Sequence, residues 1–390
     1  MIKFALRRNL IYPLQLIIWH FLRNVETILI GHFFNFKNSQ IYTSIMFIGE
    51  FVSGLIIYLY EKNFVKRNKK PAKFLSITLI QNEAKLDYPD SNTKIFILIF
   101  FIAFFDWFQF YIWTVNIPRT KNISTTFLDR LNGAKPIICS FVYYYVLRLP
   151  VFKHQIFSLI IIGICFAIII ISEFCFQKIN IVFTYLDFIL VLLMILLNHI
   201  LSSLIDLVEK YLFEYNFLNP FYVLMWEGIF GFFISFLFFL MPDYLDDIKQ
   251  VYNTLSTGKI ILFTFLLLLY IILSGGRNIF RVVTIKLYSP MARGLTDYFL
   301  QPFYSIYYFS MGTDFLVDEK RNILYFTINL ILSIILSICG CIYNEFIILF
   351  FCGFERNTHD QISKRANIIS ESLYSINDEL ESFDFNIRNN

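Results

Sequence analysis

Charged residues inside long apolar runs are the part of this chain most able to do chemistry. An ionisable side chain is costly inside a bilayer, so it faces a cavity, a ligand or an opposite charge. We interpret the basic residues placed well inside such runs as candidates for binding an anionic substrate. They are Arg130, Lys135, Arg277 and Arg293.

The run that holds Arg277 also contains a helix breaker and a second arginine. Arg277 directly follows Gly275 and Gly276. Paired glycines weaken a helix, and broken helices line the binding sites of transporters. Arg281 lies one turn further on, and we expect its charge to extend to the cytosolic surface.

Acidic residues inside the runs have two interpretations. Each is either a structural carboxyl bonded to a neighbouring helix or a group that couples transport to a substrate or a proton. Glu50 and Glu227 each precede a glycine by four residues, where helix backbones can approach closely. Asp297 follows Arg293 by four residues, which stacks the two on one helix face and allows a structural ion pair. The four candidates are Glu50, Asp106, Glu227 and Asp297.

Tyrosines follow a proline on two of the runs. Tyr144 lies in a Tyr-rich stretch after Pro136, and Tyr304 lies in a similar stretch after Pro302. Such rings can stack on a base or a sugar, although aromatic belts at the membrane surface explain many of them. We retain Tyr144 and Tyr304 as substrate-binding candidates, with the belt as the alternative.

Ten apolar runs must position these residues. The chain is 57% hydrophobic and 16% charged, whereas a soluble domain carries roughly a quarter charged residues. Runs of about 20 residues fit a bilayer. We therefore expect an all-α polytopic membrane protein with ten transmembrane helices. Their predicted ranges are 10–31, 41–60, 93–115, 124–147, 153–175, 184–208, 218–241, 260–283, 288–311 and 323–352.

The predicted helices divide into two halves of five. Residues 10–175 form the first half, which includes a basic cytosolic loop at 61–92, and residues 184–352 form the second. Residues 1–9 are predicted to be a cytosolic N-terminus. Residues 353–390 are polar and mixed in charge, and we expect a disordered cytosolic tail.

Similar features recur in the same order in both halves. They are separated by 177, 165, 166 and 172 residues along the chain. Five helices per half is an odd number, so the second half would be inverted in the membrane, as alternating-access transporters are built. The matching pairs are Glu50 and Glu227, Lys94 and Lys259, Pro136 and Pro302, and Glu173 and Glu345.

The distribution of basic residues predicts the orientation. With the N-terminus inside, the inside segments hold 20 Lys and Arg and the outside segments hold 8. Positively charged loops remain in the cytosol. Both termini are therefore predicted to be cytosolic.

Three stretches carry a family resemblance. In residues 206–239 an acidic helix end at Glu209 is followed by Pro220 and then by a Glu-Gly…Gly-Phe run that begins at Glu227. This order resembles the sixth and seventh helices of the drug/metabolite transporter superfamily, in its solute carrier 35, nucleotide-sugar-transporter-like branch. Residues 125–173 are similar to the family's fourth and fifth helices, and residues 289–303 to its ninth.

The resemblance covers nearly all of residues 10–352 and implies a function. It implies transport of a nucleotide sugar or nucleotide across an internal membrane (Golgi, ER or lysosome-like) rather than the plasma membrane. Family members place basic residues on the fourth and ninth helices for a phosphate-bearing substrate, which matches Arg130, Lys135 and Arg293. One departure is Asn132, which stands where the family commonly has an arginine.

The sequence thus predicts a secondary transporter of a small, anionic metabolite, working by alternating access. It leaves open a proton-coupled exporter of another small organic solute and a non-transporting membrane receptor or scaffold. Neither a Gly-x-Ser-x-Gly nor a His-Glu-x-x-His motif occurs, so we predict no enzyme. We expect a small-molecule substrate and membrane lipids as partners, with no nucleic acid, cofactor or metal, and a homodimer is left open.

Overall fold

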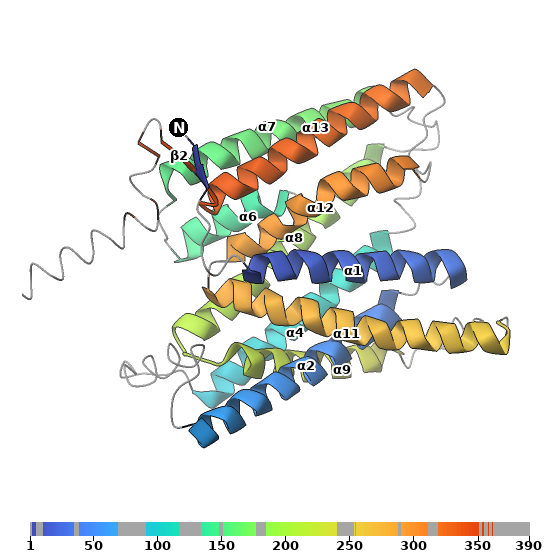
Figure 1. The fold of residues 1–390 in the computed structure, drawn as a ribbon, viewed down its shortest axis with the longest axis vertical. Helices are drawn as coiled ribbons and strands as arrows, with labels where there is room; N and C mark the ends of the chain where they lie inside the picture. Colours follow the sequence, from blue (N-terminus) through green and yellow to red (C-terminus); the bar gives the residue numbers. More distant parts are fainter. Residues whose placement is uncertain are drawn as a thin grey trace, which may run out of the picture.

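Helices dominate the computed structural model of the chain (Figure 1). Predictions that concern Asn132, most of the 61–92 loop and the tail lie outside the residues that the structure describes. Those residues are 2–4, 11–34, 39–68, 91–116, 134–147, 151–176, 185–239, 253, 255–287, 290–310, 319–350, 353, 354, 358 and 361.

Each predicted apolar run contains a described helix. A short antiparallel sheet, which the sequence did not predict, joins β1 (Ile2–Phe4) to β2 (Ile347–Leu349). α6 continues as a π-helical turn, η3 (Tyr143–Leu147). The helices are α1 (Ile11–Phe34), α2 (Ser39–Asn68), α4 (Asn92–Asn116), α6 (Lys135–Val142), α7 (Lys153–Phe176), α8 (Tyr185–Glu214), α9 (Pro220–Phe239), α11 (Thr257–Leu287), α12 (Pro290–Ser310) and α13 (Glu319–Tyr343).

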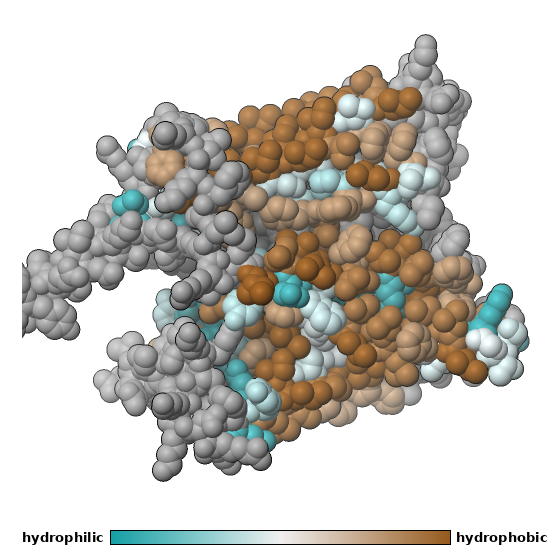
Figure 2. Space-filling view, in the orientation of Figure 1, coloured by the Kyte–Doolittle hydropathy of each residue, from teal (hydrophilic) through white to brown (hydrophobic). Residues whose placement is uncertain are grey.

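Among the described residues, seven helices are long and apolar enough to cross a membrane: α2, α4, α7, α8, α9, α11 and α13. Apolar side chains also cover much of the exterior (Figure 2). On α7 and α13, for example, Ile160, Ile164, Ile331 and Ile334 are exposed. Lipid tails would cover such a surface. The chain is an all-α polytopic membrane protein, as predicted.

The helices lie side by side in one bundle (Figure 1). α7 and α13 pack together at one end, and α2 and α9 pack together at the other. Between them, α1 packs on α11 and α12, while α8 packs on α4 and α6. α11 also contacts α2, and α9 contacts α4. Helices distant in sequence therefore supply most of the central contacts.

The contact between α2 and α9 leaves no room for side chains at its glycines. A Cβ atom on Gly54 would lie 2.8 Å from the Met225 backbone nitrogen, and one on Gly228 would lie 2.4 Å from the Phe51 nitrogen. Gly54, the later of the two α2 residues, meets Met225, the earlier of the two α9 residues, while Phe51 meets Gly228. The two helices therefore run antiparallel. The close approach brings buried side chains of both helices to one level.

The paired glycines of α11 do not break the helix, contrary to the expectation from sequence. α11 continues through Gly275 and Gly276 as a single helix of 31 residues. A Cβ on Gly275 would lie 2.9 Å from the Gly49 carbonyl oxygen, and one on Gly276 would lie 2.4 Å from Trp19 Cε3. The glycines therefore allow α2 and α1 to approach α11 closely.

The last predicted run, 323–352, was too long, because α13 ends at Tyr343. Glu345 adopts a φ of 62°. The Phe346 N–H donates to the Cys341 carbonyl at 2.8 Å, and the Glu345 N–H donates to the Ile342 carbonyl at 3.1 Å. This pair of bonds is the Schellman arrangement, in which glycine usually takes the left-handed position. Because Glu345 takes this position, the sequence has no glycine that would mark the C-terminal end of α13.

Candidate functional site

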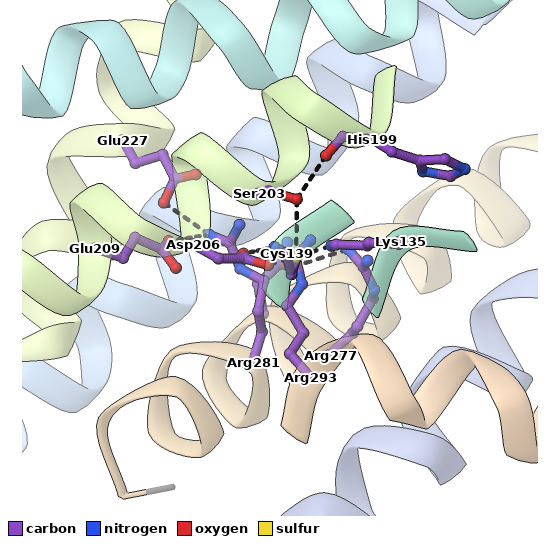
Figure 3. A network of polar contacts seen from close by, with 11 residues as sticks. Lys135, Cys139, His199, Ser203, Asp206, Glu209, Glu227, Arg277, Arg281 and Arg293 are labelled. Atoms are coloured by element: carbon purple, nitrogen blue, oxygen red, sulfur yellow. Dashed lines mark hydrogen bonds and ion pairs between the residues drawn. The ribbon is translucent and has the colours of Figure 1, made fainter. Parts of the chain in front are cut away.

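Charged residues from both predicted halves converge between the helices in a buried charge network (Figure 3). The carboxylates come from α2, α4, α8 and α9, and the cations come from α6, α11 and α12. The described members are Glu50, Asp106, Asp206, Glu209, Glu227, Lys135, Arg277, Arg281 and Arg293.

Asp206 of α8 holds two of the predicted cations. Lys135 Nζ lies 3.2 Å from Asp206 Oδ2, and Arg293 forms an ion pair with Oδ1 of the same carboxylate. The Asp206 side chain is wholly buried. One carboxylate therefore faces one cation from α6 and another from α12.

One turn away, α6 and α8 are also joined by weaker polar contacts. The Ser203 hydroxyl donates to the His199 carbonyl at 2.7 Å. Its oxygen lies 2.8 Å from Cys139 Sγ, so the thiol is the donor in that contact. Cys139 and Ser203 are both buried. These contacts fix the spacing of the helices that carry Lys135 and Asp206.

Arg281 lies at the centre of the other part of the network. Its Nη2 lies 2.7 Å from Glu227 Oε2 and 2.9 Å from Glu209 Oε1. The side chain is 1% exposed. The expectation that Arg281 extends to the membrane surface is therefore wrong, because two buried carboxylates hold its guanidinium inside the bundle.

Three carboxylates form what we call the acidic triad: Glu50, Asp106 and Glu227. One oxygen of each lies within 4.8 Å of the others, and all three residues are buried. The Asn278 amide donates to Glu50 Oε1 at 2.6 Å, and Arg277 Nη1 donates to Asn278 Oδ1 at 3.0 Å. Glu50 and Glu227, which occupy matching positions in the two predicted halves, thus lie close together in space.

Charge is unevenly distributed over the described members of the network. At the Asp206 end, the two cations Lys135 and Arg293 face a single carboxylate. At the other end, two guanidiniums accompany the acidic triad and Glu209. Among the described members, cations therefore outnumber carboxylates near Asp206, and carboxylates outnumber cations near the acidic triad.

The structure does not bring all the predicted site residues together. Successive residues of a helical turn point in different directions, so Tyr143 is buried while Tyr144 is 54% exposed. Tyr144 packs edge-on against Tyr145, with ring centroids 5.4 Å apart, and lies away from the network. The structure does not describe the side chains of Arg130, Asp297 and Tyr304.

Sequence reasoning missed three members of the network: Asp206, Glu209 and Arg281. The run predicted at 184–208 stops short, because α8 extends to Glu214. Asp206 and Glu209 are three residues apart, which places both on one helix face. That spacing was the available signal.

Lys210, near the C-terminal end of α8, links this helix to the C-terminal end of α11. Its ammonium group donates to the carbonyl oxygens of Ile285 and Lys286, each at 3.2 Å, and pairs with Glu214 at 2.7 Å. These contacts cap the last turn of α11 with a positive charge, where free carbonyl groups otherwise lack donors. The α8–α11 contact is thereby fixed next to Arg281.

Comparisons with known proteins assign no family to the chain. It matches no protein-family model, and no curated protein matches its sequence. Support for a function therefore comes from the fold and from the buried charge network.

Proposed function

We propose that the chain is a secondary transporter that moves a small, anionic metabolite by alternating access. The observation that carries this proposal is the buried charge network at the contact between the two predicted halves. Lys135 of the first half reaches Asp206 of the second, and Asn278 of the second half donates to Glu50 of the first.

A network of this kind is costly for a protein that only needs an anchor. Buried ion pairs often stabilise a fold no more than well-packed apolar residues would, and ionisable groups at membrane depth usually mark substrate or ion pathways. A transporter site therefore explains the network better than a receptor or scaffold does.

The neighbour relations of the helices support ten spans in two inverted repeats. The predicted repeat exchanges α1 with α8, α2 with α9, α4 with α11 and α6 with α12. This exchange converts the α1–α11 contact into α8–α4, the α2–α11 contact into α9–α4 and the α1–α12 contact into α8–α6, and all six contacts occur. The antiparallel pair α2–α9 exchanges with itself, as expected for helices beside a two-fold axis in the membrane plane.

The Asp206 end is the proposed site for the anion. Arg and Lys bind carboxylate and phosphate groups through charge-assisted hydrogen bonds. A substrate anion would compete with Asp206 for Lys135 and Arg293, one from each half. Nucleotide sugars and nucleotides are the leading candidates, on the resemblance to the drug/metabolite transporter superfamily in its solute carrier 35 branch.

We propose that the protein lies in an internal membrane of the cell with both termini in the cytosol. This orientation is supported by the 20-to-8 distribution of Lys and Arg. Pairing of β1 with β2 supports placing the first residues on the same side as the end of α13.

A ligand screen followed by uptake tests the proposal. Purified protein is melted with nucleotides, nucleotide sugars, amines and organic acids, because a ligand that binds the folded state raises its melting temperature. The stabilising ligand is then used in proteoliposomes with the wild type and Lys135→Gln. Arg293 still balances Asp206 in this variant, so we expect normal folding and loss of uptake.

Lys259→Gln is the matched control, because this lysine is exposed at the start of α11. It should transport like the wild type. Stabilisation only by amines, or full uptake by Lys135→Gln, would count against an anionic substrate.

A further inference from the structure

The acidic triad brings three buried carboxylates within 4.8 Å of one another. They come from α2, α4 and α9, so both predicted halves contribute. We propose that the triad binds one proton, shared between Glu50 and Glu227, and that this proton is the coupling ion of transport. Only the coupling rests on the proposed function; the binding of the proton does not.

Glu50 and Glu227 each have one oxygen that is held and one that is not. Asn278 donates to Glu50 Oε1, and Arg281 donates to Glu227 Oε2. Both side chains are wholly buried, yet Glu50 Oε2 and Glu227 Oε1 accept no hydrogen bond from the described residues. A protonated carboxyl supplies the O–H donor that a pair of carboxylates lacks. A shared proton needs an oxygen–oxygen distance of roughly 2.5–3.0 Å, so we propose that the two side chains rotate toward one another when the proton binds.

The charges that face Glu50 leave a negative excess. Glu227 faces it from α9, Asp106 from α4, and Arg277 and Arg281 from α11. Arg281 is shared with Glu209 of α8, and the Glu209 carboxyl also faces Glu227 within hydrogen-bonding range. Among the described residues, four carboxylates therefore share two guanidiniums, and one bound proton reduces the excess.

A proton fits this place better than a metal ion. α2, α4, α9 and α11 continue through the level of the triad as unbroken helices, so their carbonyl oxygens accept hydrogen bonds within the helix. Ca²⁺ takes at least about six oxygen ligands, and no turn of these helices frees backbone oxygens to add to the carboxylates. A proton requires only two oxygen atoms.

Binding of the proton would change the contacts between helices. Protonation converts a carboxylate to a carboxylic acid with no other reactant, and it weakens the Arg281–Glu227 pair. Arg281 retains Glu209, so α11 remains attached to α8 while its hold on α9 loosens. Uptake of the proton from one side and release to the other would thus accompany rearrangement of α9 against α2 and α11.

The test follows the pH dependence of unfolding of the purified full-length chain without any substrate. The folded wild type holds a proton that the unfolded chain has released, so its stability falls as pH rises. The unfolding equilibrium constant should increase about tenfold per pH unit where the difference is one proton. Glu50→Gln mimics the proton-bound form. It should lose this dependence and melt at or above the wild-type temperature at high pH.

Two further variants make the result specific. Asp106→Asn removes another charge of the triad and should also flatten the pH dependence. Lys259→Gln changes a charge that is exposed at the start of α11, away from the triad, so it should melt like the wild type and keep the dependence.

Three results would overturn the proposal. The first is an unchanged pH dependence in Glu50→Gln, and the second is a failure of both Glu50→Gln and Asp106→Asn to fold. The third is stabilisation of the wild type, but not of Glu50→Gln, by Na⁺ or Ca²⁺ at fixed pH, which would assign the triad to a metal ion. The unfolding experiment contains no substrate. Its result therefore tests proton binding separately from transport, even if transport assays prove negative.

Discussion

Arg281→Met is the perturbation whose effect the structure determines most closely. The guanidinium is 1% exposed and holds two carboxylates that are themselves wholly buried, Glu209 and Glu227. Removal of one partner of a buried ion pair costs about 3–5 kcal/mol, because the remaining charge loses its compensation. Two carboxylates lose their partner here, so we expect the upper part of that range.

The assay is thermal unfolding in detergent, with tryptophan fluorescence as the signal. At the roughly 2 °C per kcal/mol expected for a large domain, the melting temperature should fall by about 8–10 °C. Lys259→Met is the matched control on the same helix. Its side chain is exposed, and a surface substitution of this kind usually changes stability by no more than about 0.5 kcal/mol.

A triple variant separates charge from packing. When Arg281→Met is combined with Glu209→Gln and Glu227→Gln, both carboxylates that form ion pairs with Arg281 are neutralised as well. Replacement of a whole buried ion cluster by neutral groups is often neutral or stabilising. We therefore expect the triple variant to recover most of the loss. A triple variant as unstable as Arg281→Met, or less stable, would refute the electrostatic explanation and assign the loss to packing.

Three other substitutions test separate parts of the structure. Gly228→Val should prevent folding, because its Cβ would lie 2.4 Å from a backbone nitrogen of α2. Gly163→Ala should melt like the wild type, because nothing lies within 4 Å of a Cβ at that position. Expression and thermal melting of the two variants test both expectations. Asn219→Ala should cost about 1 kcal/mol in a denaturant titration, since the side chain caps α9 by accepting from a backbone N–H at 2.8 Å. Asp206→Asn should lower the melting temperature more than Lys135→Gln, because it removes the carboxylate that two cations share; equal effects would contradict the charge count.

The positions of the helices could be predicted because long apolar runs form helices in a membrane, and seven of the described helices have the length and composition to cross one. The ends were less predictable. α8 continues past its predicted end at residue 208 to Glu214, and Glu209 in this extension pairs with a buried cation of α11. α13 stops early because Glu345 takes a left-handed conformation that a sequence pattern assigns to glycine.

The partners of the charges could not be predicted, since sequence spacing shows only neighbours on one helix. The structure pairs Arg293 with Asp206, 87 residues away, a partner that no spacing on one helix could indicate. The predicted pair of Arg293 with Asp297 is not tested, because the structure does not describe the Asp297 side chain. Arg281 was assigned to the surface from its place near the end of an apolar run. Its carboxylates lie on α8 and α9, which only the three-dimensional packing brings together. The proximity of Glu50 and Glu227 was not predicted either, because matching positions in two halves do not show whether the residues meet.

Counterflow in proteoliposomes tests the central claim most directly. Vesicles loaded with the unlabelled ligand from the thermal screen are diluted into a trace of labelled ligand. An alternating-access transporter exchanges one for the other, so the account predicts a transient accumulation of label that wild-type protein supports and Lys135→Gln does not. Label that merely equilibrates, or that enters protein-free vesicles equally fast, would contradict the account.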